Sequence, residues 1–217
     1  MSQQELTLIV AATRSMGIGL NGSMPWQGLR KEMQYFARVT TRLPPQAAPG
    51  SVNAVIMGRK TWDSIPPKFR PLKDRLNIVV TRSAKDSMVS PLPPPSLPLR
   101  EPLRVSSFER ALACAGARCG DGRVFVMGGA QIYAAALDRR EARRVLLTSI
   151  DREFGCDTHF PLHLTCGGAL GWARRDRGEL EGWTGEQVEE GWQEEAGIRY
   201  EFQMWEKIPG SEIIQNI

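Results

Sequence analysis

The feature that most constrains how this chain can fold is an alternation of short, almost continuously apolar segments with longer amphipathic ones. The apolar segments are rich in branched residues and too short for helices, so they predict strands. These strands are Leu6–Ala12, Ala54–Met57, Leu76–Val80 and Val124–Met127, and the helices expected among them are Leu29–Val39, Ser107–Ala117 and Ala130–Leu137. Strands that lack polar alternation are covered on both faces, as in parallel sheets. The pattern predicts an α/β fold with a doubly wound, mostly parallel central sheet and helices on both faces.

The last third of the chain has a different pattern. Val145–Ile150 and Ile198–Trp205 predict strands, and we expect no helix between them. Polar and apolar residues alternate in the second, so we expect it to be an antiparallel C-terminal strand at or near the sheet edge. Gly167–Gly197 is rich in Gly, Glu and Trp, which predicts irregular surface structure and one short strand.

A proline-rich stretch raises the question of how many domains there are. Pro91–Pro102 holds six of the fifteen prolines, which excludes a helix or an inner strand. A linker between two domains is one interpretation, but the segments on either side hold too few strands to close a core alone. We therefore expect a single domain over residues 1–217, with a proline-rich surface insertion at about residues 90–103.

Composition narrows the class of protein. Of the 217 residues, 41% are hydrophobic and 24% are charged, as in globular proteins, and no apolar run has the length that a membrane span needs. Met1–Glu5 has neither the basic start nor the apolar stretch of a signal peptide, so we expect a cytoplasmic protein. The net charge of +4 comes without an arginine-rich run or an aromatic-interleaved basic patch. Neither a membrane nor a specific nucleic acid is therefore expected as a partner.

One group of residues could in principle bind zinc. Cys156, His159, His163 and Cys166 are all zinc-ligand types, but Pro161 interrupts them. Their spacing matches no common structural zinc pattern, so no metal is expected.

A glycine motif suggests dinucleotide binding at first sight. Gly17–Gly22 spells G-x-G-x-x-G directly after the first strand. Met24-Pro25-Trp26 follows where the helix of a Rossmann fold should begin, and no acidic ribose ligand follows at the expected distance. A mobile glycine-rich loop over Gly17–Ser23, next to a ligand, is the better interpretation, because glycine permits close backbone approach.

An acidic residue stands out in the first predicted helix. Glu32 shares an apolar stripe with Leu29, Met33 and Phe36 at helical spacing. A buried charge without a partner costs several kcal/mol, and taken alone Glu32 is better placed pointing to solvent beside Arg30 and Lys31.

Three predicted strands end in residues that suit phosphate groups. Gly58–Thr61 and Thr81–Ser83 combine arginine with hydroxyl groups, and Gly128–Tyr133 begins with paired glycines before a helix. Each cluster alone is also an ordinary polar strand end. Open α/β sheets bind ligands at the carboxyl ends of their parallel strands, and two basic clusters there suggest a ligand with a monoester phosphate such as NADPH.

Taken in order, these segments resemble the dihydrofolate reductase family, eukaryotic type. The resemblance runs from Leu6 to about Lys207 and is carried by Met16–Gly19, Met24–Trp26, Leu29–Glu32, Met57–Trp62, Ser64–Pro66, Arg70–Leu72, Arg75–Asn77, Val126–Gly129, Tyr133 and Asp157–Pro161. It implies the α/β fold above, NADPH as cofactor, dihydrofolate as substrate, antifolates as inhibitors and a monomer. It also implies a cis peptide between Gly128 and Gly129.

The resemblance assigns roles to individual residues. The catalytic group would be Glu32, Trp26 and Thr148, with Glu32 pairing with the 2-amino group and neighbouring nitrogen of the pterin. Substrate would contact Ile9, Val10, Ala11, Met33, Phe36, Ile65, Leu72, Arg75, Met127 and Tyr133, where Arg75 holds the glutamate carboxylate. NADPH would contact Ala11, Gly17, Ile18, Gly19, Leu20, Asn21, Gly22, Ser23, Gly58, Arg59, Lys60, Thr61, Thr81, Arg82, Ser83, Gly128, Gly129, Ala130, Gln131, Ile132 and Tyr133.

The implied reaction is hydride transfer from C4 of NADPH to C6 of 7,8-dihydrofolate, with protonation at N5. Two alternatives stay open: a reductase of another pteridine or a pyrimidine, and a non-enzymatic folate- or nucleic-acid-binding module. The proline-rich stretch departs from shorter relatives. Ser106 and Ser107 stand where some relatives place a basic phosphate ligand, with Arg104 as a weak substitute.

Overall fold

The computed structural model describes residues 4–84, 101–165 and 168–210, and the chain divides into two compact units. Unit 1 comprises Met1–Leu6 and Thr40–Glu141, and unit 2 comprises Thr7–Val39 and Ala142–Ile217. Each unit is built from two separate stretches of sequence. The single domain stays a prediction, and most of the proline-rich insertion, residues 90–100, lies outside the described residues.

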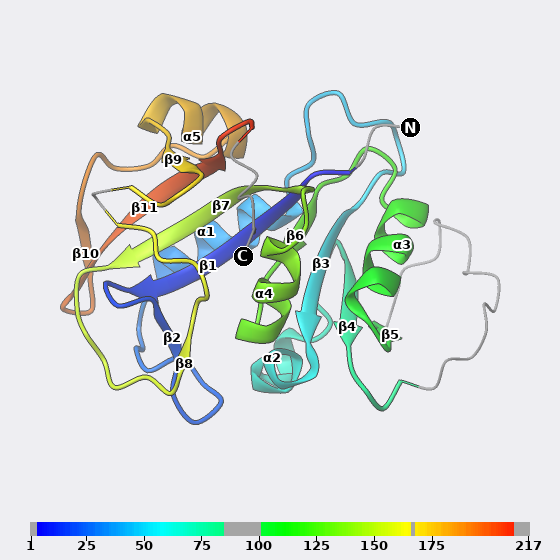
Figure 1. Cartoon of the computed structure of the whole chain (residues 1–217), viewed down its shortest axis with the longest axis horizontal. Coiled ribbons are helices and arrows are strands. Elements are labelled where there is room, and N and C mark those ends of the chain that lie inside the picture. The colour runs from blue at the N-terminus through cyan, green and yellow to red at the C-terminus, as the bar shows by residue number, and fades with distance from the viewer. Residues whose placement is uncertain (1–3, 85–100, 166–167, 211–217) are drawn as a thin grey trace, which may run out of the picture. The chain divides into compact units, whose positions relative to one another are not determined.

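Unit 1 is built on parallel strands with helices between them in sequence (Figure 1). Its elements are β3 (Asn53–Gly58), α2 (Arg59–Ser64), the 3-10 turn η1 (Pro67–Phe69), β4 (Arg75–Val80), β5 (Leu103–Val105), α3 (Phe108–Arg118), β6 (Val124–Val126) and α4 (Ala130–Leu137). The strand order is β6-β3-β4-β5, and each of these pairs is parallel. Ile56 pairs with Ile78 on one side and Val126 on the other, and all three side chains are fully buried. The parallel strands and the helices predicted for this region are confirmed to within one or two residues.

Unit 2 holds the antiparallel part of the chain. Its elements are β1 (Leu6–Thr13), β2 (Gly17–Gly19), α1 (Arg30–Thr41), β7 (Ala142–Ile150), β8 (Thr158–His159), β9 (Trp172–Arg174), α5 (Arg177–Thr184), β10 (Gln193–Glu195) and β11 (Ile198–Lys207), apart from the first residue of β1 and the last two of α1. The strand order is β10-β11-β7-β1, and β2 and β8 form a separate two-stranded sheet. β11 runs antiparallel to β7, as predicted. It lies one place inside the edge, because the short β9 and β10 pair with it as well.

The prediction that no helix lies between β7 and β11 is wrong. α5 spans Arg177–Thr184, and two short strands, β9 and β10, accompany it where only one was expected. The start of α5 is a capping box, in which Asp176 Oδ1 accepts from Glu179 N at 2.8 Å and Glu179 Oε2 accepts from Asp176 N at 3.2 Å. Gly185 ends the helix with φ +70, in the left-handed region that favours glycine. These two signals outweigh the scarcity of apolar residues in this stretch.

The helix that carries Glu32 is fixed by aromatic packing. α1 lies behind β1 and β7 in the view of Figure 1. Tyr35 on α1 stacks on Phe202 of β11 with ring centroids 3.9 Å apart, and Tyr200 meets Phe202 edge-on at 5.4 Å. Such ring pairs stabilise beyond the area that they bury, so the face that α1 presents to the strands is well defined.

Among the described residues, no helix combines the length and the apolar character needed to cross a membrane.

Candidate active site

Glu32 points inward. It lies in the first turn of α1, and the residue is only 7% exposed, although Arg30 and Lys31 beside it are exposed. Its carboxylate accepts a hydrogen bond from Thr148 Oγ1 on β7, where Oγ1 and Oε1 are 3.2 Å apart. Burial statistics favour a solvent-facing glutamate, so this geometry calls for a partner that can compensate the buried charge.

The surroundings of Glu32 raise the pKa of its carboxyl group from 4.5 to about 7. The largest cause is burial, which disfavours the ionised form. The hydrogen bond from Thr148 opposes that effect, and the negative charge of Glu195 adds to it. Without a ligand, the carboxyl group of Glu32 is therefore about half-protonated at neutral pH. A ligand that brings two hydrogen-bond donors or a positive charge would convert it to the carboxylate.

Trp26 presents a second buried polar atom in unit 2. The residue is 4% exposed and belongs to a buried cluster with Leu29, Ile150, Ile198 and Tyr200. Within the described part of the chain, its indole Nε1 has no hydrogen-bond partner. A buried donor without an acceptor is costly, so this position suits a water or a polar ligand atom.

The apolar residues predicted to contact the substrate differ in burial. Ile9 and Val10 on β1 are buried, and Ala11 and Phe36 are half-buried. Met33 is 48% exposed, so it does not share the buried stripe with Leu29 as expected. Tyr35 takes that place, because its ring stacks on β11.

The loop Gly17–Ser23 is an ordered hairpin rather than a helix start. Gly17 and Gly19 pair with His159 and Thr158 in the β2–β8 sheet, which confirms that the glycine motif does not form a Rossmann turn. Asn21 and Gly22 both have positive φ, +52 and +79, and Leu20 and Ser23 exchange two backbone hydrogen bonds around them. An Asn-Gly pair with these angles is typical of a type I′ hairpin turn. Asp157 Oδ2 accepts from Asn21 N at 2.8 Å and so holds the tip of the loop to the segment before β8.

In unit 1, the ends of β3 and β6 bring several predicted cofactor residues together. Gly58 N donates to Gly128 O at 2.7 Å, and the peptide between Gly128 and Gly129 is cis, as expected. A Cβ on Gly128 would lie 3.0 Å from the ring of Tyr133, and one on Gly129 would lie 3.5 Å from Thr61 Oγ1. Glycine at position 128, whose φ is +105, therefore lets the ring of Tyr133 pack against this backbone, beside the first residues of α4.

The basic and hydroxyl residues at the other strand ends are accessible. Arg59, Lys60, Arg82 and Ser83 are exposed. Arg59 Nη1 lies 2.8 Å from Asp63 Oδ2, one turn further along α2. This exposed ion pair is worth little, so the guanidinium can exchange the carboxylate for a phosphate at small cost. Thr81 is buried, and its hydroxyl lies 3.0 Å from that of Ser83.

Two hydrogen bonds hold the guanidinium of Arg75 at the start of β4. Its Nη1 donates to Thr40 Oγ1 at 2.7 Å, and its Nε donates to Lys73 O at 2.9 Å. Burial lowers the pKa of the guanidinium to about 10, which leaves it protonated at neutral pH. Leu72 is half-buried and anchored by Asn77, whose amide bonds both the N–H and the carbonyl of Leu72. The guanidinium is thus braced to receive a carboxylate.

The remaining predicted residues lie within their units as follows. In unit 1, Ile65, Met127, Ala130 and Ile132 are half-buried and Gln131 is exposed; in unit 2, Ile18 is half-buried.

Ser107, considered as a phosphate ligand, caps α3 instead by accepting from Arg110 N at 3.2 Å, while Arg104 is exposed on β5. Cys166 lies outside the described residues, and the part of the chain that the structure describes holds no group of three acidic, histidine or cysteine side chains arranged to bind a metal.

Sequence reasoning missed two residues that surround Glu32. Tyr35 was not recognised, although it follows Glu32 by three residues, a spacing that places both side chains on one face of a helix. No local sequence pattern indicated Glu195, because it belongs to a hairpin far along the chain from α1.

Comparisons with known proteins agree on one family. The dihydrofolate reductase family model matches residues 5–166. The dihydrofolate reductase of Pneumocystis carinii is 41% identical over 211 residues, which cover 94% of this chain and 97% of the relative. Those of Candida albicans and Sus scrofa are each 36% identical over 212 and 213 residues, covering 94% and 93% of this chain and 98% and 97% of the relatives. The solved structure of Schistosoma mansoni dihydrofolate reductase aligns with a TM-score of 0.69 and 31% identity, over 95% of this chain and all of that one. The predicted α/β fold class is thereby confirmed.

Proposed function

The chain belongs to the dihydrofolate reductase family, and on that premise we propose that Glu32 is the residue on which its pterin chemistry depends. The family makes it an NADPH-dependent oxidoreductase that reduces dihydrofolate to tetrahydrofolate, and the alternative of a non-enzymatic binding module is set aside. The assignment of individual residues to this reaction is the proposal.

The observation that carries the proposal is the buried carboxyl of Glu32. A pterin offers it an amino group and a neighbouring ring nitrogen, which together can donate two hydrogen bonds to one carboxylate. Charge-assisted pairs of this kind are stronger than neutral ones, and they favour the ionised form that burial opposes. Thr148 then orients Oε1, and Trp26 Nε1 offers a donor to a water or polar atom beside it.

Glu32 acts as a fixed charge rather than as the direct proton donor. N5 of dihydrofolate is a weak base in bulk water. A carboxylate held in a dry pocket favours positive charge on the pterin in the transition state, while a water delivers the proton.

The glutamate part of the substrate would contact Arg75. Arg75, braced by Thr40, presents its guanidinium to the α-carboxylate in a two-bond fork. Ile65 and Leu72, half-buried nearby in sequence, would line the aminobenzoyl part.

The residues of unit 1 also fit NADPH, which supplies the hydride when it is bound. Arg59, Thr81 and Arg82 would hold its 2′-phosphate, and Lys60, Thr61 and the Gly128–Tyr133 segment its pyrophosphate. The fit rests on the paired glycines at the start of α4, where a Cβ on Gly128 would press on the ring of Tyr133 and shift this segment. In unit 2 the hairpin Gly17–Ser23, together with Ala11, would cover the nicotinamide and exclude water, so loop opening could limit turnover.

The central test replaces one charge. We expect Glu32→Gln to slow the hydride step in single-turnover NADPH oxidation by at least about 100-fold, because it removes a preorganised charge. Affinity for NADPH, measured by tryptophan fluorescence, should stay within about twofold, since a single local change far in sequence from the phosphate residues removes no cofactor contact. Glu194→Gln on β10, an exposed carboxylate, is the matched control. Near-normal turnover in Glu32→Gln would refute the assignment.

Substrate range, location and assembly are proposed on family grounds. We expect dihydrofolate to be preferred over other pteridines and pyrimidines in a substrate panel, and a diaminopyrimidine antifolate to abolish NADPH oxidation. A cytoplasmic location and a monomeric state complete the proposal. Light scattering after gel filtration measures the latter, and a mass twice that of the chain would contradict it.

A further inference from the structure

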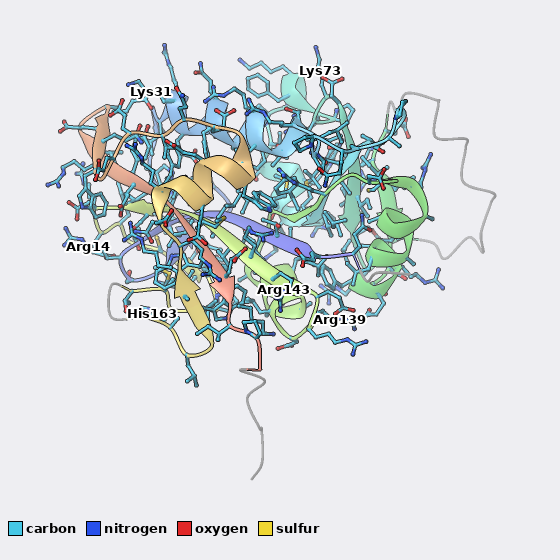
Figure 2. The ribbon with its side chains drawn as sticks, turned by 90° about the horizontal axis from the view of Figure 1, so that it is seen from above. Arg14, Lys31, Lys73, Arg139, Arg143 and His163 are labelled. Carbon is cyan, nitrogen blue, oxygen red and sulfur yellow. The ribbon has the colours of Figure 1, made fainter. Side chains whose placement is uncertain are left out.

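A second carboxylate, that of Glu195, lies at the N-terminal end of α1, the helix that carries Glu32. α1 begins at Arg30, and Leu29 before it has no side-chain oxygen that could cap the helix. The first N–H groups of a helix lack partners within it, and a Ser, Thr, Asp or Asn normally supplies one. Here the acceptor comes from 164 residues away, because Glu195 Oε2 accepts from Lys31 N at 2.9 Å. The side chain of Lys31 itself is exposed and points outward (Figure 2).

Glu195 is fixed by the hairpin of β10 and β11. It pairs with Ile198 across the two-residue turn Ala196–Gly197, where φ is +54 and +72, as a type I′ turn requires. The turn lies against the segment that enters α1, because a Cβ on Gly28 would be 2.9 Å from that of Ala196. The hairpin therefore contacts the beginning of α1 at two points, one through a backbone N–H and one through packing.

The negative charge of Glu195 also acts on Glu32. Its charge raises the pKa of Glu32, after burial as the largest cause. Glu32 is also coupled to Tyr35 on α1 and to Tyr200 on β11, and Thr148 of β7 bonds it without a charge. Burial raises the pKa of both phenols, to about 12 for Tyr200, so they are neutral near pH 7. The charge that acts on Glu32 is thus that of the Glu195 carboxylate.

We propose that Glu195 is a positioning residue for dihydrofolate reduction, which fixes the first turn of α1 through Lys31 N and places a negative charge beside Glu32. It acts through Glu32 and contacts no substrate. The added negative potential strengthens the attraction of the pocket for a pterin that becomes positively charged. This inference rests on the proposed role of Glu32.

The two contributions can be separated by two substitutions. Glu195→Gln keeps an oxygen that can accept from Lys31 N but removes the charge, whereas Glu195→Ala removes both. Glu194→Gln, an exposed carboxylate one residue away on the opposite face of β10, is the matched control. The readout is the carbon-13 NMR titration of the glutamate carboxyl groups in the ligand-free chain, with Glu32→Gln identifying the resonance of Glu32.

We expect the titration midpoint of Glu32 to fall in Glu195→Gln and Glu195→Ala and to stay unchanged in Glu194→Gln. The pH profile of single-turnover NADPH oxidation should move in the same direction in Glu195→Gln. The melting temperature should fall clearly in Glu195→Ala and only slightly in Glu195→Gln, because the cap persists in the latter. A midpoint for Glu195→Gln that coincides with the unsubstituted chain would overturn the electrostatic half of the proposal. Equal melting temperatures for the Ala and Gln variants would overturn the capping half.

Failure of this inference is distinguishable from failure of the proposed function. If Glu32→Gln reduces dihydrofolate at a near-normal rate, the role of Glu32 fails, whatever the titration shows. If Glu32→Gln is inactive and the titration midpoint of Glu32 is the same in the Glu195 variants as in the unsubstituted chain, only the inference about Glu195 is wrong.

Discussion

At the scale of single residues, the ionised form of Glu32 is stabilised by the hydroxyl of Thr148 and destabilised by burial and by the charge of Glu195. These influences leave it close to half-ionised at neutral pH. A ligand that brings hydrogen-bond donors shifts that balance toward the carboxylate. The ionisation state of Glu32 is therefore set by opposing effects, and those of Thr148 and Glu195 can each be removed by a single substitution.

Removing the hydroxyl of Thr148 tests one of these terms. Thr148→Val keeps the shape of the side chain but deletes the hydrogen bond that lowers the pKa of Glu32, so the midpoint should rise above about 7. The carboxyl would then stay protonated to higher pH, and its NMR titration should show this directly. Thr148→Ser, which keeps a donor, should retain most of the original midpoint. A Val variant that titrates like the unsubstituted chain would show that the hydrogen bond has no influence.

Glu32 could be singled out from sequence because it lies within an apolar helical pattern. That pattern alone favours exposure, and only the order of the motifs around it gave the carboxylate a ligand to face. Thr148 and Glu195 could not be found by local pattern. They are 116 residues from Glu32 and 164 residues from Lys31, respectively, and helix spacing holds no information about such contacts.

At the scale of elements, the parallel strands were predictable because buried strands are continuously apolar. α5 was not, because its sequence, RGELEGWT, has few apolar residues and two glycines. Its ends nevertheless carry specific signals, a reciprocal Asp176–Glu179 cap and Gly185 in the left-handed region. In this helix the caps carry more information than the interior.

The importance of that cap can be measured. Asp176→Ala removes the acceptor for Glu179 N and should lower the free energy of unfolding by about 1 kcal/mol. Urea unfolding should show a lower midpoint with an unchanged slope. Asp176→Ser retains a capping oxygen and should recover most of the loss. If Ser and Ala destabilise equally, the capping box does not stabilise α5.

At the scale of the whole molecule, the buried carboxyl makes stability depend on pH. The pKa of Glu32 is raised from 4.5 in the unfolded reference to about 7 in the folded chain, so the folded state binds its proton more tightly. The favourable contribution is complete below about pH 4.5 and is lost as the pH rises to about 7. At 1.36 kcal/mol per pKa unit, the full loss is on the order of 3 kcal/mol.

Glu32→Gln should therefore stabilise the ligand-free chain. We expect its free energy of unfolding to exceed that of the unsubstituted chain at pH 8, and the difference to vanish toward pH 4. On the proposed role of Glu32, a saturating diaminopyrimidine should reverse the order, because it would bind the carboxylate of the folded state. Denaturant unfolding at several pH values measures both effects. A difference that does not vary with pH would show that Glu32 titrates normally.

The long sequence separation of Thr148 and Glu195 from α1 has a consequence for biosynthesis. Thr148 emerges from the ribosome only 116 residues after Glu32, and Glu195 later still. Unit 2 cannot be completed until Thr40–Glu141, the larger stretch of unit 1, which lies between the two stretches of unit 2 in sequence, has been made. Glu32 therefore acquires its surroundings only long after it has itself been synthesised. Chaperones and proteases that survey the growing chain would meet Glu32 in water until the segments of Thr148 and Glu195 have been translated.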